Sequence, residues 1–307
     1  MKYLESFTFP SLDEEVMYLE GGDDLRVKYY RGSFYPFKVL SYLEITNVII
    51  GNITIFYGGN GCGKTTALNV IAEKLGVRRE SLFNSAKFFP EYLTLCRFAV
   101  PDTRETADQR ARRFAGIQDT NLPTASRIIT SDDVFDHCMS QRRFNTDIDR
   151  QRADAEERYN AVMSRSHINP LEEYEAYKER AEAMKSRSAF VRKRICQEAD
   201  EHSNGESAML YFSERITDPG LYLLDEPENS LSFENQRTLA DMIEELAATG
   251  RYQFIIASHS PVFLAMRDAL IYDFDHVPVK TRKWTDLDGV REMFGFFKEY
   301  EHLFEEY

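Results

Sequence analysis

The sequence predicts an α/β fold in which a parallel sheet is covered by helices, with an antiparallel lobe at the N-terminus and an inserted helical subdomain. Three observations predict it. Short apolar runs of β type recur along the chain, at residues 53–57, 221–224, 254–257 and 270–272. Helical patterns follow the first two runs, and strands that alternate with helices are typical of parallel sheets. Residues 133–202, between these runs, are mostly helical in pattern.

The first fifty residues predict the antiparallel lobe. Two β-type runs cover residues 25–30 and 37–45. Glycine-containing turn signals precede and separate them, as in strands joined by short connections. We therefore expect these two runs to be strands of a small sheet that opens the chain.

The α/β part follows from each run in order. Residues 53–57 combine β-branched and aromatic side chains, which is typical of a buried strand. Residues 64–75 carry apolar side chains at helical spacing, and Gly76 is placed to close the helix. Residues 232–248 repeat this arrangement, with Gly250 just beyond the end. The remaining runs are continuously apolar, as parallel strands buried on both faces are.

We expect a single domain over residues 1–307. Within it, residues 133–202 form the helical subdomain and residues 262–307 form a C-terminal strand and helix extension. Residues 146–202 hold 11 basic and 13 acidic side chains, which indicates a mixed-charge helical region.

Composition indicates a globular protein. Of 307 residues, 43% are hydrophobic and 29% are charged, which argues against global disorder. No run approaches the roughly 20 apolar residues of a membrane helix, and the first residues lack the apolar segment of a signal peptide. The four cysteines are far apart, which predicts neither a zinc site nor a disulfide framework: Cys62, Cys96, Cys138 and Cys196. We therefore expect a cytoplasmic location and no membrane partner.

The charge balance bears on nucleic acid. Acidic residues outnumber basic ones by 51 to 38, a formal net charge of −13. Proteins that coat nucleic acid gain affinity by neutralising phosphates, so a dedicated DNA binder is disfavoured. Contact through a local basic patch stays compatible with this balance.

A complete GxxxxGK[ST] pattern lies between the 53–57 strand and the 64–75 helix. Glycines let the backbone N–H groups converge on phosphate oxygens, and the helix N-terminus adds the positive end of its dipole. Lys64 would reach the β- and γ-phosphates, and the Thr65 hydroxyl would bind Mg²⁺. A chance match in a glycine-rich turn is the alternative, and the strand–loop–helix context disfavours it. The predicted nucleotide site comprises Gly58, Gly59, Asn60, Gly61, Cys62, Gly63, Lys64, Thr65 and Thr66.

Polar residues follow two further predicted strands. Asp225 and Glu226 come at the end of the 221–224 run, and His259 follows the 254–257 run. The carboxyl ends of parallel strands meet at one sheet edge, where open α/β sheets bind ligands. We expect Asp225 to hold the metal, Glu226 to activate the attacking water, and His259 to contact the γ-phosphate. An ordinary polar turn for the carboxylates, and a structural histidine, are the alternatives.

These motifs together resemble an ABC-type ATPase. Residues 202–207 resemble the family's signature sequence, and residues 230–232 resemble its D-loop. The resemblance implies a mixed sheet of the P-loop NTPase type, with ATP and Mg²⁺ as ligands. It also implies an ATP-sandwich homodimer, in which Ser203 and Gly205 bind the γ-phosphate held by a second subunit.

The residues of these motifs are more similar to those of the SMC–RecF branch and its stand-alone bacterial AAA/ABC relatives than to those of transporter subunits. Some of those relatives stand in phage-defence operons beside an effector. The sequence departs from the pattern at Asn204, where a glycine is commoner. It also has no clear Q-loop glutamine: residues 131–133 occupy that place by order, and Gln118 is the runner-up. Tyr29 and Tyr30 are weak candidates for stacking on adenine.

Three outputs of such an ATPase compete. The favoured one is a switch that regulates or scaffolds a separate effector protein. The second is DNA repair or maintenance, with a DNA path lined by Lys185, Arg187, Arg192, Lys193 and Arg194. The third is the ATP-binding subunit of a transporter. For the basic cluster, a solvated helix face is the simpler interpretation, because acidic residues follow it closely.

Overall fold

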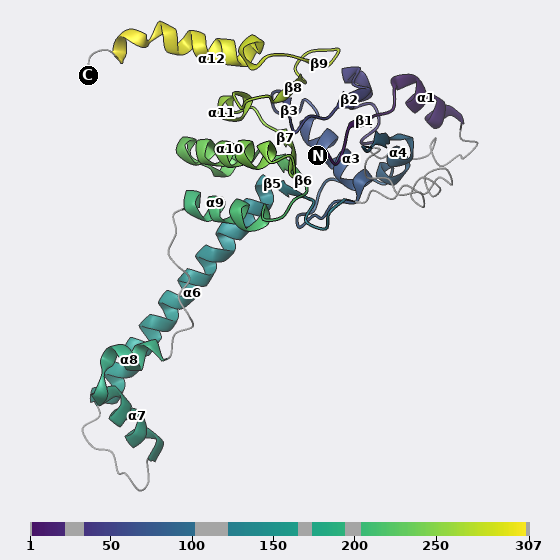
Figure 1. The fold of residues 1–307 in the computed structure, drawn as a ribbon. Helices are drawn as coiled ribbons and strands as arrows, with labels where there is room; N and C mark the ends of the chain where they lie inside the picture. Colours follow the sequence, from purple (N-terminus) through teal and green to yellow (C-terminus); the bar gives the residue numbers. More distant parts are fainter. Residues whose placement is uncertain (1, 22–33, 102–121, 165–173, 194–203, 305–307) are drawn as a thin grey trace. The chain divides into compact units, whose positions relative to one another are not determined.

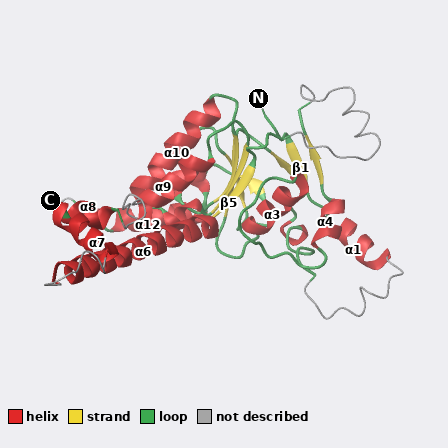
Figure 2. Cartoon of the chain, turned by 90° about the horizontal axis from the view of Figure 1, so that it is seen from below, coloured by secondary structure: helices red, strands yellow, loops and turns green. Residues whose placement is uncertain are grey.

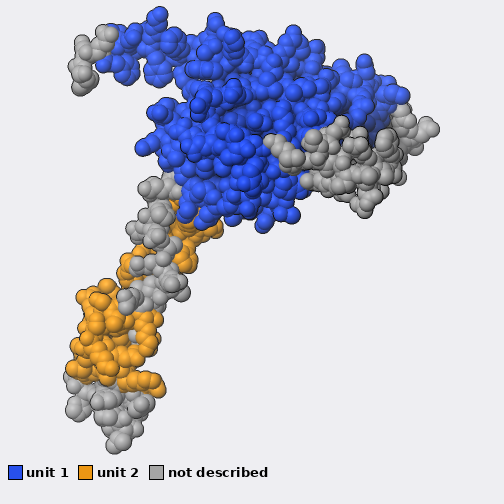
Figure 3. Space-filling view, in the orientation of Figure 1, with its two compact units in different colours: residues 1–134, 208–307 blue, residues 135–207 orange. Residues whose placement is uncertain are grey.

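The computed structural model describes residues 2–21, 34–101, 122–164, 174–193 and 204–304. Their contacts divide into two compact units (Figure 3). Unit 1 comprises residues 1–134 and 208–307, and unit 2 comprises residues 135–207.

The main sheet of unit 1 has the strand order β5-β6-β7-β3-β8-β9 (Figure 1). All pairs are parallel except that of the edge strand β9, which runs antiparallel to β8. The register places Asp225 of β6 opposite Ala257 of β7, which lies opposite Phe56 of β3. The carboxyl ends of these three strands are therefore level. The bounds are β3 Ile53–Tyr57, β5 Arg127–Thr130, β6 Leu221–Asp225, β7 Gln253–Ala257, β8 Leu270–Asp273 and β9 Lys280–Thr281.

A second, antiparallel sheet forms the N-terminal lobe, in the order β2-β1-β4. Its strands are β1 Ser6–Thr8, β2 Asn47–Ile49 and β4 Arg97–Ala99. The predicted lobe is confirmed, but from other residues. The predicted strand at 37–45 is wrong: this run forms turns and the 3-10 helix η1 (Ser41–Leu43). The predicted strand at 25–30 lies outside the described residues.

The turn conformation of residues 37–45 has a physical reason. Phe37 and Leu40 are buried three residues apart, a spacing that a turn satisfies and an alternating strand does not. Lys38 and Glu44 adopt positive φ angles of 64° and 51°, which reverse the chain. The aromatic and apolar content that suggests a strand is used instead to fill the core.

Helices cover both faces of the main sheet. Figure 2 shows α3 on one side of the strands and α9 and α10 on the other. The N-terminal helix α1 begins with a capping box, in which Ser11 and Glu14 each accept a hydrogen bond from the other's backbone N–H. The bounds in unit 1 are α1 Leu12–Gly21, α3 Lys64–Leu75, α4 Phe89–Leu95, η3 Pro227–Ser230, α10 Phe233–Ala248, α11 Pro261–Leu264, η4 Trp284–Asp286, α12 Asp288–Glu299 and η5 Glu301–Leu303.

The core explains why the apolar runs are continuous. Every residue of β3, β6 and β7 is buried, so neither face of these strands has room for an alternating polar pattern. Gly76 ends α3 with a φ of 65°, and its N–H bonds carbonyl groups of the last turn, as predicted for a helix-closing glycine. Ser232 caps α10 by accepting a hydrogen bond from the Asn235 N–H.

Unit 2 is helical. It contains most of α6 (Ser131–Ser164), then α7 (Tyr174–Lys185), α8 (Arg187–Arg192) and the start of α9 (Asn204–Arg215). A small core joins α6, α7 and α8, built from Val162, Ala183 and Phe190 with Tyr159 against them. The predicted boundaries of one domain over 1–307 with a subdomain at 133–202 stay a prediction.

The fold class is confirmed: an α/β protein with a mixed sheet of the P-loop type, an antiparallel N-terminal lobe and a helical insertion. Across the described parts of the chain, none of the helices is both long and apolar enough to span a bilayer.

Candidate functional site

The phosphate loop connects β3 to α3, as the sequence predicts. Gly63 caps α3 with a φ of 101°, a left-handed conformation that suits glycine. Position 58 also requires glycine, because a Cβ atom there would lie 2.6 Å from the Cys62 Sγ. The loop is therefore shaped by glycines where the chain turns and where it crosses itself closely.

Lys64 points back along the loop. Its side chain is 2% exposed, and its Nζ donates hydrogen bonds to the carbonyl oxygens of Gly58 (2.7 Å) and Gly59 (2.8 Å). The Nζ also lies 3.5 Å from the Glu226 Oε1. A buried ammonium group held by carbonyl oxygens and one carboxylate is positioned at the centre of the loop, where phosphates would meet it.

Thr65 and Asp225 meet although 160 residues separate them. The Thr65 Oγ1 donates a hydrogen bond of 3.0 Å to the Asp225 Oδ1. Burial raises the pKa of Asp225 to about 6, and the hydrogen bond from Thr65 opposes this shift. A carboxylate and a hydroxyl side by side form an oxygen donor set of the kind that Mg²⁺ prefers. The predicted metal ligands thus lie together.

We expect Asp225→Asn to raise the free energy of unfolding of the metal-free protein and to abolish its stabilisation by Mg²⁺. The pKa of Asp225 in the fold exceeds its ordinary value of 3.8, so the folded protein binds more protons between these values. The free energy of unfolding therefore rises as pH falls from about 6 to about 4. Asparagine removes the buried charge, so the metal-free variant should be more stable by about 1–3 kcal/mol near pH 8 and no more stable near pH 4.

The measurement is chemical unfolding at the two pH values, with thermal unfolding in Mg²⁺ and ATP beside it. Any added stabilisation by Mg²⁺ should disappear in Asp225→Asn. Asp241→Asn, at an exposed position of α10, is the control and should change neither quantity. Equal unfolding free energies of wild type and Asp225→Asn at high pH would contradict the raised pKa of Asp225. Retained stabilisation by Mg²⁺ in the variant would contradict the role of Asp225 as a metal ligand.

Glu226 follows β6 in a left-handed conformation, with φ 48° and ψ 54°. This is an uncommon backbone for a residue other than glycine, and it turns the side chain towards the loop. The Glu226 N–H donates to the Ala257 carbonyl oxygen (2.9 Å), and the Asn229 side-chain amide donates to the Glu226 Oε2 (3.0 Å). Both contacts fix the carboxylate opposite Lys64.

His259 is placed by a residue that the sequence analysis missed. The buried Glu228 accepts hydrogen bonds at Oε1 from the Ser258 Oγ and the His259 N–H, both 2.8 Å. The His259 Nδ1 lies 3.3 Å from the same oxygen, and about half of the histidine side chain is exposed. His259 therefore presents its ring at the edge where β6 and β7 end. The signal for Glu228 is its place three residues after Asp225, on the turn that β6 leads into.

Two residues outside the sequence motifs also contact the loop region. Asp275, just after β8, accepts a hydrogen bond from the Gly59 N–H (2.8 Å). The Tyr35 hydroxyl donates to the Thr66 Oγ1 (3.2 Å). Both residues come from segments distant in sequence, so only the fold brings them to the loop.

Other predicted residues are placed less completely. Ser203, Gln118, Tyr29 and Tyr30 lie outside the described residues, and Gly205 is the second residue of α9 in unit 2. Among the Q-loop candidates, Ser131 and Asp132 begin α6. The next residue, Asp133, accepts hydrogen bonds from the Thr130 N–H and Oγ1, which makes it part of a helix cap.

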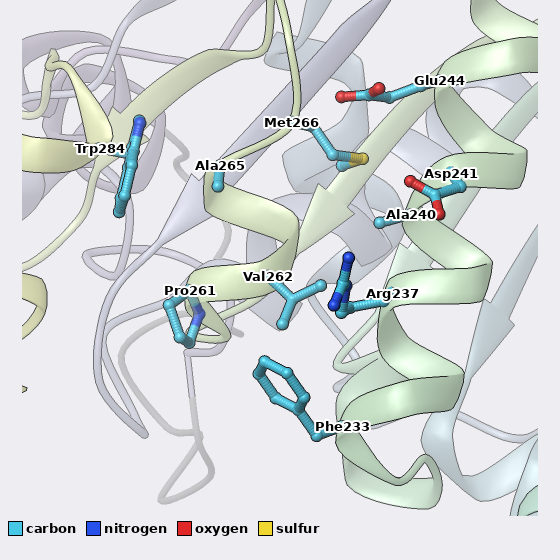
Figure 4. Close-up of a pocket in the computed structure, with 10 residues that line it drawn as sticks. All are labelled: Phe233, Arg237, Ala240, Asp241, Glu244, Pro261, Val262, Ala265, Met266 and Trp284. Carbon is cyan, nitrogen blue, oxygen red and sulfur yellow. The ribbon is translucent and has the colours of Figure 1, made fainter. Parts of the chain in front are cut away.

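A separate cavity of about 400 Å³ lies between α10 and α11. Trp284 forms one wall, and Phe233 and Val262 contribute apolar surface (Figure 4). No residue of the phosphate loop lines it, so it is distinct from the nucleotide site.

A family model described as "AAA domain, putative AbiEii toxin, Type IV TA system" matches residues 97–265, more than half of the chain. The chain belongs to this family of AAA domains. The match in this AAA domain includes Asp225, Glu226 and His259, whereas the phosphate loop precedes it. The predicted resemblance is confirmed at the level of a P-loop ATPase domain of the ABC and SMC kind. No curated protein matches this chain.

Solved structures similar to this chain include two SMC heads and an ATP-binding cassette. The SMC head domain with an extended coiled coil bound to the C-terminal domain of ScpA, from Pyrococcus furiosus, is 13% identical with a TM-score of 0.37, covering 83% of this chain and 95% of that one. The SMC head domain from Thermotoga maritima is 14% identical with a TM-score of 0.35, covering 74% and 88%. An ATP-binding cassette in a dimeric post-hydrolysis state bound to ADP and Pi is 13% identical with a TM-score of 0.34, covering 78% and 90%.

Proposed function

We propose that this protein binds and hydrolyses ATP with Mg²⁺ and acts as a switch that dimerises around ATP. One observation carries the proposal: Thr65 and Asp225 meet at 3.0 Å while Lys64 and Glu226 meet at 3.5 Å, from two strand ends that the fold brings together. The groups that we propose to bind phosphate, hold the metal and accept the proton therefore lie close together.

Binding is assigned to the loop residues and the helix that follows. Backbone N–H groups of residues 58–66 and the N-terminus of α3 favour phosphate oxygens, and Lys64 adds the only full positive charge of the loop. Thr65 and Asp225 would hold the Mg²⁺. The described residues contain no cluster of three metal-binding carboxylate, histidine or cysteine side chains, which suits an ion completed by water and substrate phosphates. Bound Mg²⁺ supplies charge neutralisation at the phosphates.

Hydrolysis is assigned to Glu226 and His259. Glu226 would accept the proton of the attacking water, and its conformation is fixed by the Ala257 carbonyl and by Asn229. His259 would donate a hydrogen bond to the γ-phosphate, held in orientation by Glu228. The direct test is phosphate release from ATP: we expect turnover that requires Mg²⁺ and stops with a chelator. Absence of turnover and of ATP-dependent stabilisation would refute the assignment.

The dimer rests on the signature residues. In a head-to-tail sandwich, each ATP lies between the phosphate loop of one subunit and Ser203 and Gly205 of the other, and closure excludes water from the phosphates. Loss of the γ-phosphate would remove the contact that favours the closed state. We propose that this cycle, more than the turnover itself, is the output.

Mixing two inactive variants tests the sandwich. Lys64→Ala and Gly205→Asp should each be inactive alone, because each spoils one half of both sites. In a mixed dimer both defects fall on one site and the other site is intact. An equal mixture should therefore recover about a quarter of wild-type activity, since half of the dimers are mixed and each has one working site. Phosphate release from the mixture is the measurement, and each variant mixed with itself is the control. Once exchange of subunits between the two variants has been verified, no recovery would mean that the two residues act in one subunit.

The proposed output is regulation of a separate effector protein in the cytoplasm, as in bacterial defence, by an ATPase built as one domain over residues 1–307. DNA maintenance is the second candidate. Of its five basic residues, Arg194 lies outside the described residues. Arg187 is paired with Glu156 and Lys193 with Glu182, which supports a solvated helix face. Salt-dependent DNA binding in the presence of ATP would favour the DNA candidate. Co-purification with a membrane protein would favour a transporter subunit.

A further inference from the structure

The C-terminal helix α12 (Figure 1) carries large apolar side chains that are exposed within the part of the chain that the structure describes. None of its residues is buried. Phe294, Phe296 and Phe297 are 69%, 58% and 53% exposed. The α12 face, as we define it, consists of Met293, Phe294, Phe296, Phe297 and Tyr300, continued by Leu303 and Phe304 in the following turn.

This helix is fixed at its N-terminus to the nucleotide-binding unit. Leu287, just before it, is fully buried. The Asp288 carboxylate lies 3.2 Å from the His276 Nε2. Gly289 packs so tightly on Tyr57, the last residue of β3, that a Cβ atom would lie 2.6 Å from the tyrosine hydroxyl. The face is therefore presented by an anchored helix, which lowers the entropy lost on association.

The area of the α12 face is that of one side of a stable interface. A fully exposed aromatic side chain offers about 150–250 Å², so seven large side chains that are about half exposed offer roughly 700 Å². A typical monomer has a largest apolar patch of about 300–600 Å². Two such faces together would bury roughly 1,400 Å², within the range of standard protein interfaces.

The charged residues of α12 indicate which kind of partner covers the α12 face. The charged residues of α12 lie on its other side, and they number three acidic against two basic: Asp288, Glu292, Glu299, Arg291 and Lys298. Helices that lie on membranes carry a polar face rich in lysine and arginine, so this composition disfavours a bilayer. A two-fold interface sets a face against itself, and the seven side chains of this face carry no charge; the exposed Glu301 lies in the turn between Tyr300 and Leu303.

We propose that the α12 face pairs with the α12 face of a second copy, forming a dimer that needs no nucleotide. Because the pairing is isologous, the same aromatic side chains are buried on both copies. For the proposed ATP-dependent closure, the pairing raises the effective concentration of the second phosphate loop, and this consequence alone rests on the proposed function.

The test is sedimentation velocity of the full chain without nucleotide, over the micromolar range. Wild type is expected to be a dimer, and the double variant Phe294→Ser, Phe297→Ser a monomer. The single variant Leu82→Ser, at an exposed apolar residue that is not part of the α12 face, is the control and should stay a dimer. Lys64→Ala should also stay a dimer, which separates this pairing from any ATP sandwich.

Folding of each variant is checked by circular dichroism and thermal unfolding, and little change is expected because the face is exposed in the single chain. A wild-type monomer throughout the concentration range would overturn the proposal. So would a double variant that remains dimeric. A monomer that instead floats with neutral phosphatidylcholine vesicles would overturn it in favour of a lipid surface.

Discussion

Replacing Lys64 with alanine is expected to abolish the thermal stabilisation that ATP gives to the wild-type protein. The Lys64 ammonium is nine-tenths or more buried, is held by two loop carbonyl oxygens, and lies opposite Glu226. With it removed, Asp225 and Glu226 remain close to the position of the phosphates with no cation among the loop side chains to offset them. Phosphate binding then loses its strongest contact and meets added repulsion.

The size of the effect follows from mass action. ATP at about 100 times its dissociation constant stabilises the folded state by about 2.7 kcal/mol, and we expect the Lys64→Ala value to be close to zero. The measurement is thermal unfolding with and without ATP and Mg²⁺. Lys74→Ala is a matched control, because Lys74 lies on the same helix and its Nζ donates to the Leu93 carbonyl oxygen (2.8 Å) away from the loop. This control should lower basal stability and keep the ATP shift; an intact ATP shift in Lys64→Ala would refute the phosphate-loop assignment.

The interior of the main sheet could be predicted because its strands are buried on both faces. Residues 53–57 and 221–225 leave no choice of face, so a continuous apolar run is the whole signal. The helix at 64–75 was equally clear, since Gly76 provides a local stop that needs no tertiary information. In each case the deciding interactions are local or apply to every residue of the element.

The N-terminal lobe could not be predicted in detail because its strands are short and their partners are distant. Phe7 of β1 pairs with Val48 and with Phe98, so the sheet exists only once three remote segments meet. A three-residue strand has too little alternation to be recognised. The run at 37–45 had more strand-like composition, and packing in the core overrode it.

The candidate site also has a part that could be predicted from the sequence and a part that could not. Asp225 and His259 could be placed together because each follows a strand, and parallel strands end at one edge. Glu228, on the turn after β6, and Asp275, just after β8, also stand near strand ends, but their contacts with the Ser258 Oγ and the Gly59 N–H are set by the fold. Residues that orient others are recognised by their contacts, which the sequence does not contain.

Glu226→Gln is expected to keep ATP binding, slow hydrolysis by about 10²–10⁴-fold, and accumulate an ATP-bound dimer. Glutamine has the same shape, keeps an oxygen to accept from Asn229, and can adopt the same left-handed backbone. It cannot accept the proton of the attacking water. Because it also removes a negative charge 3.5 Å from the Lys64 Nζ, it leaves that ammonium freer to meet phosphates, so ATP binding should not weaken.

Two measurements check this expectation separately. Single-turnover phosphate release reports the chemical step, and light scattering after size exclusion reports the mass of the ATP-loaded protein. The control is Glu234→Gln, an exposed glutamate in the first turn of α10 that should leave both unchanged. Because the α12 pairing proposed above needs no nucleotide, the ATP-dependent association is measured in the Phe294→Ser, Phe297→Ser background, where only the sandwich can form. Unchanged turnover would remove Glu226 as the base, whereas slow turnover without association would keep the base and remove the sandwich, since the two results depend on different atoms of the site.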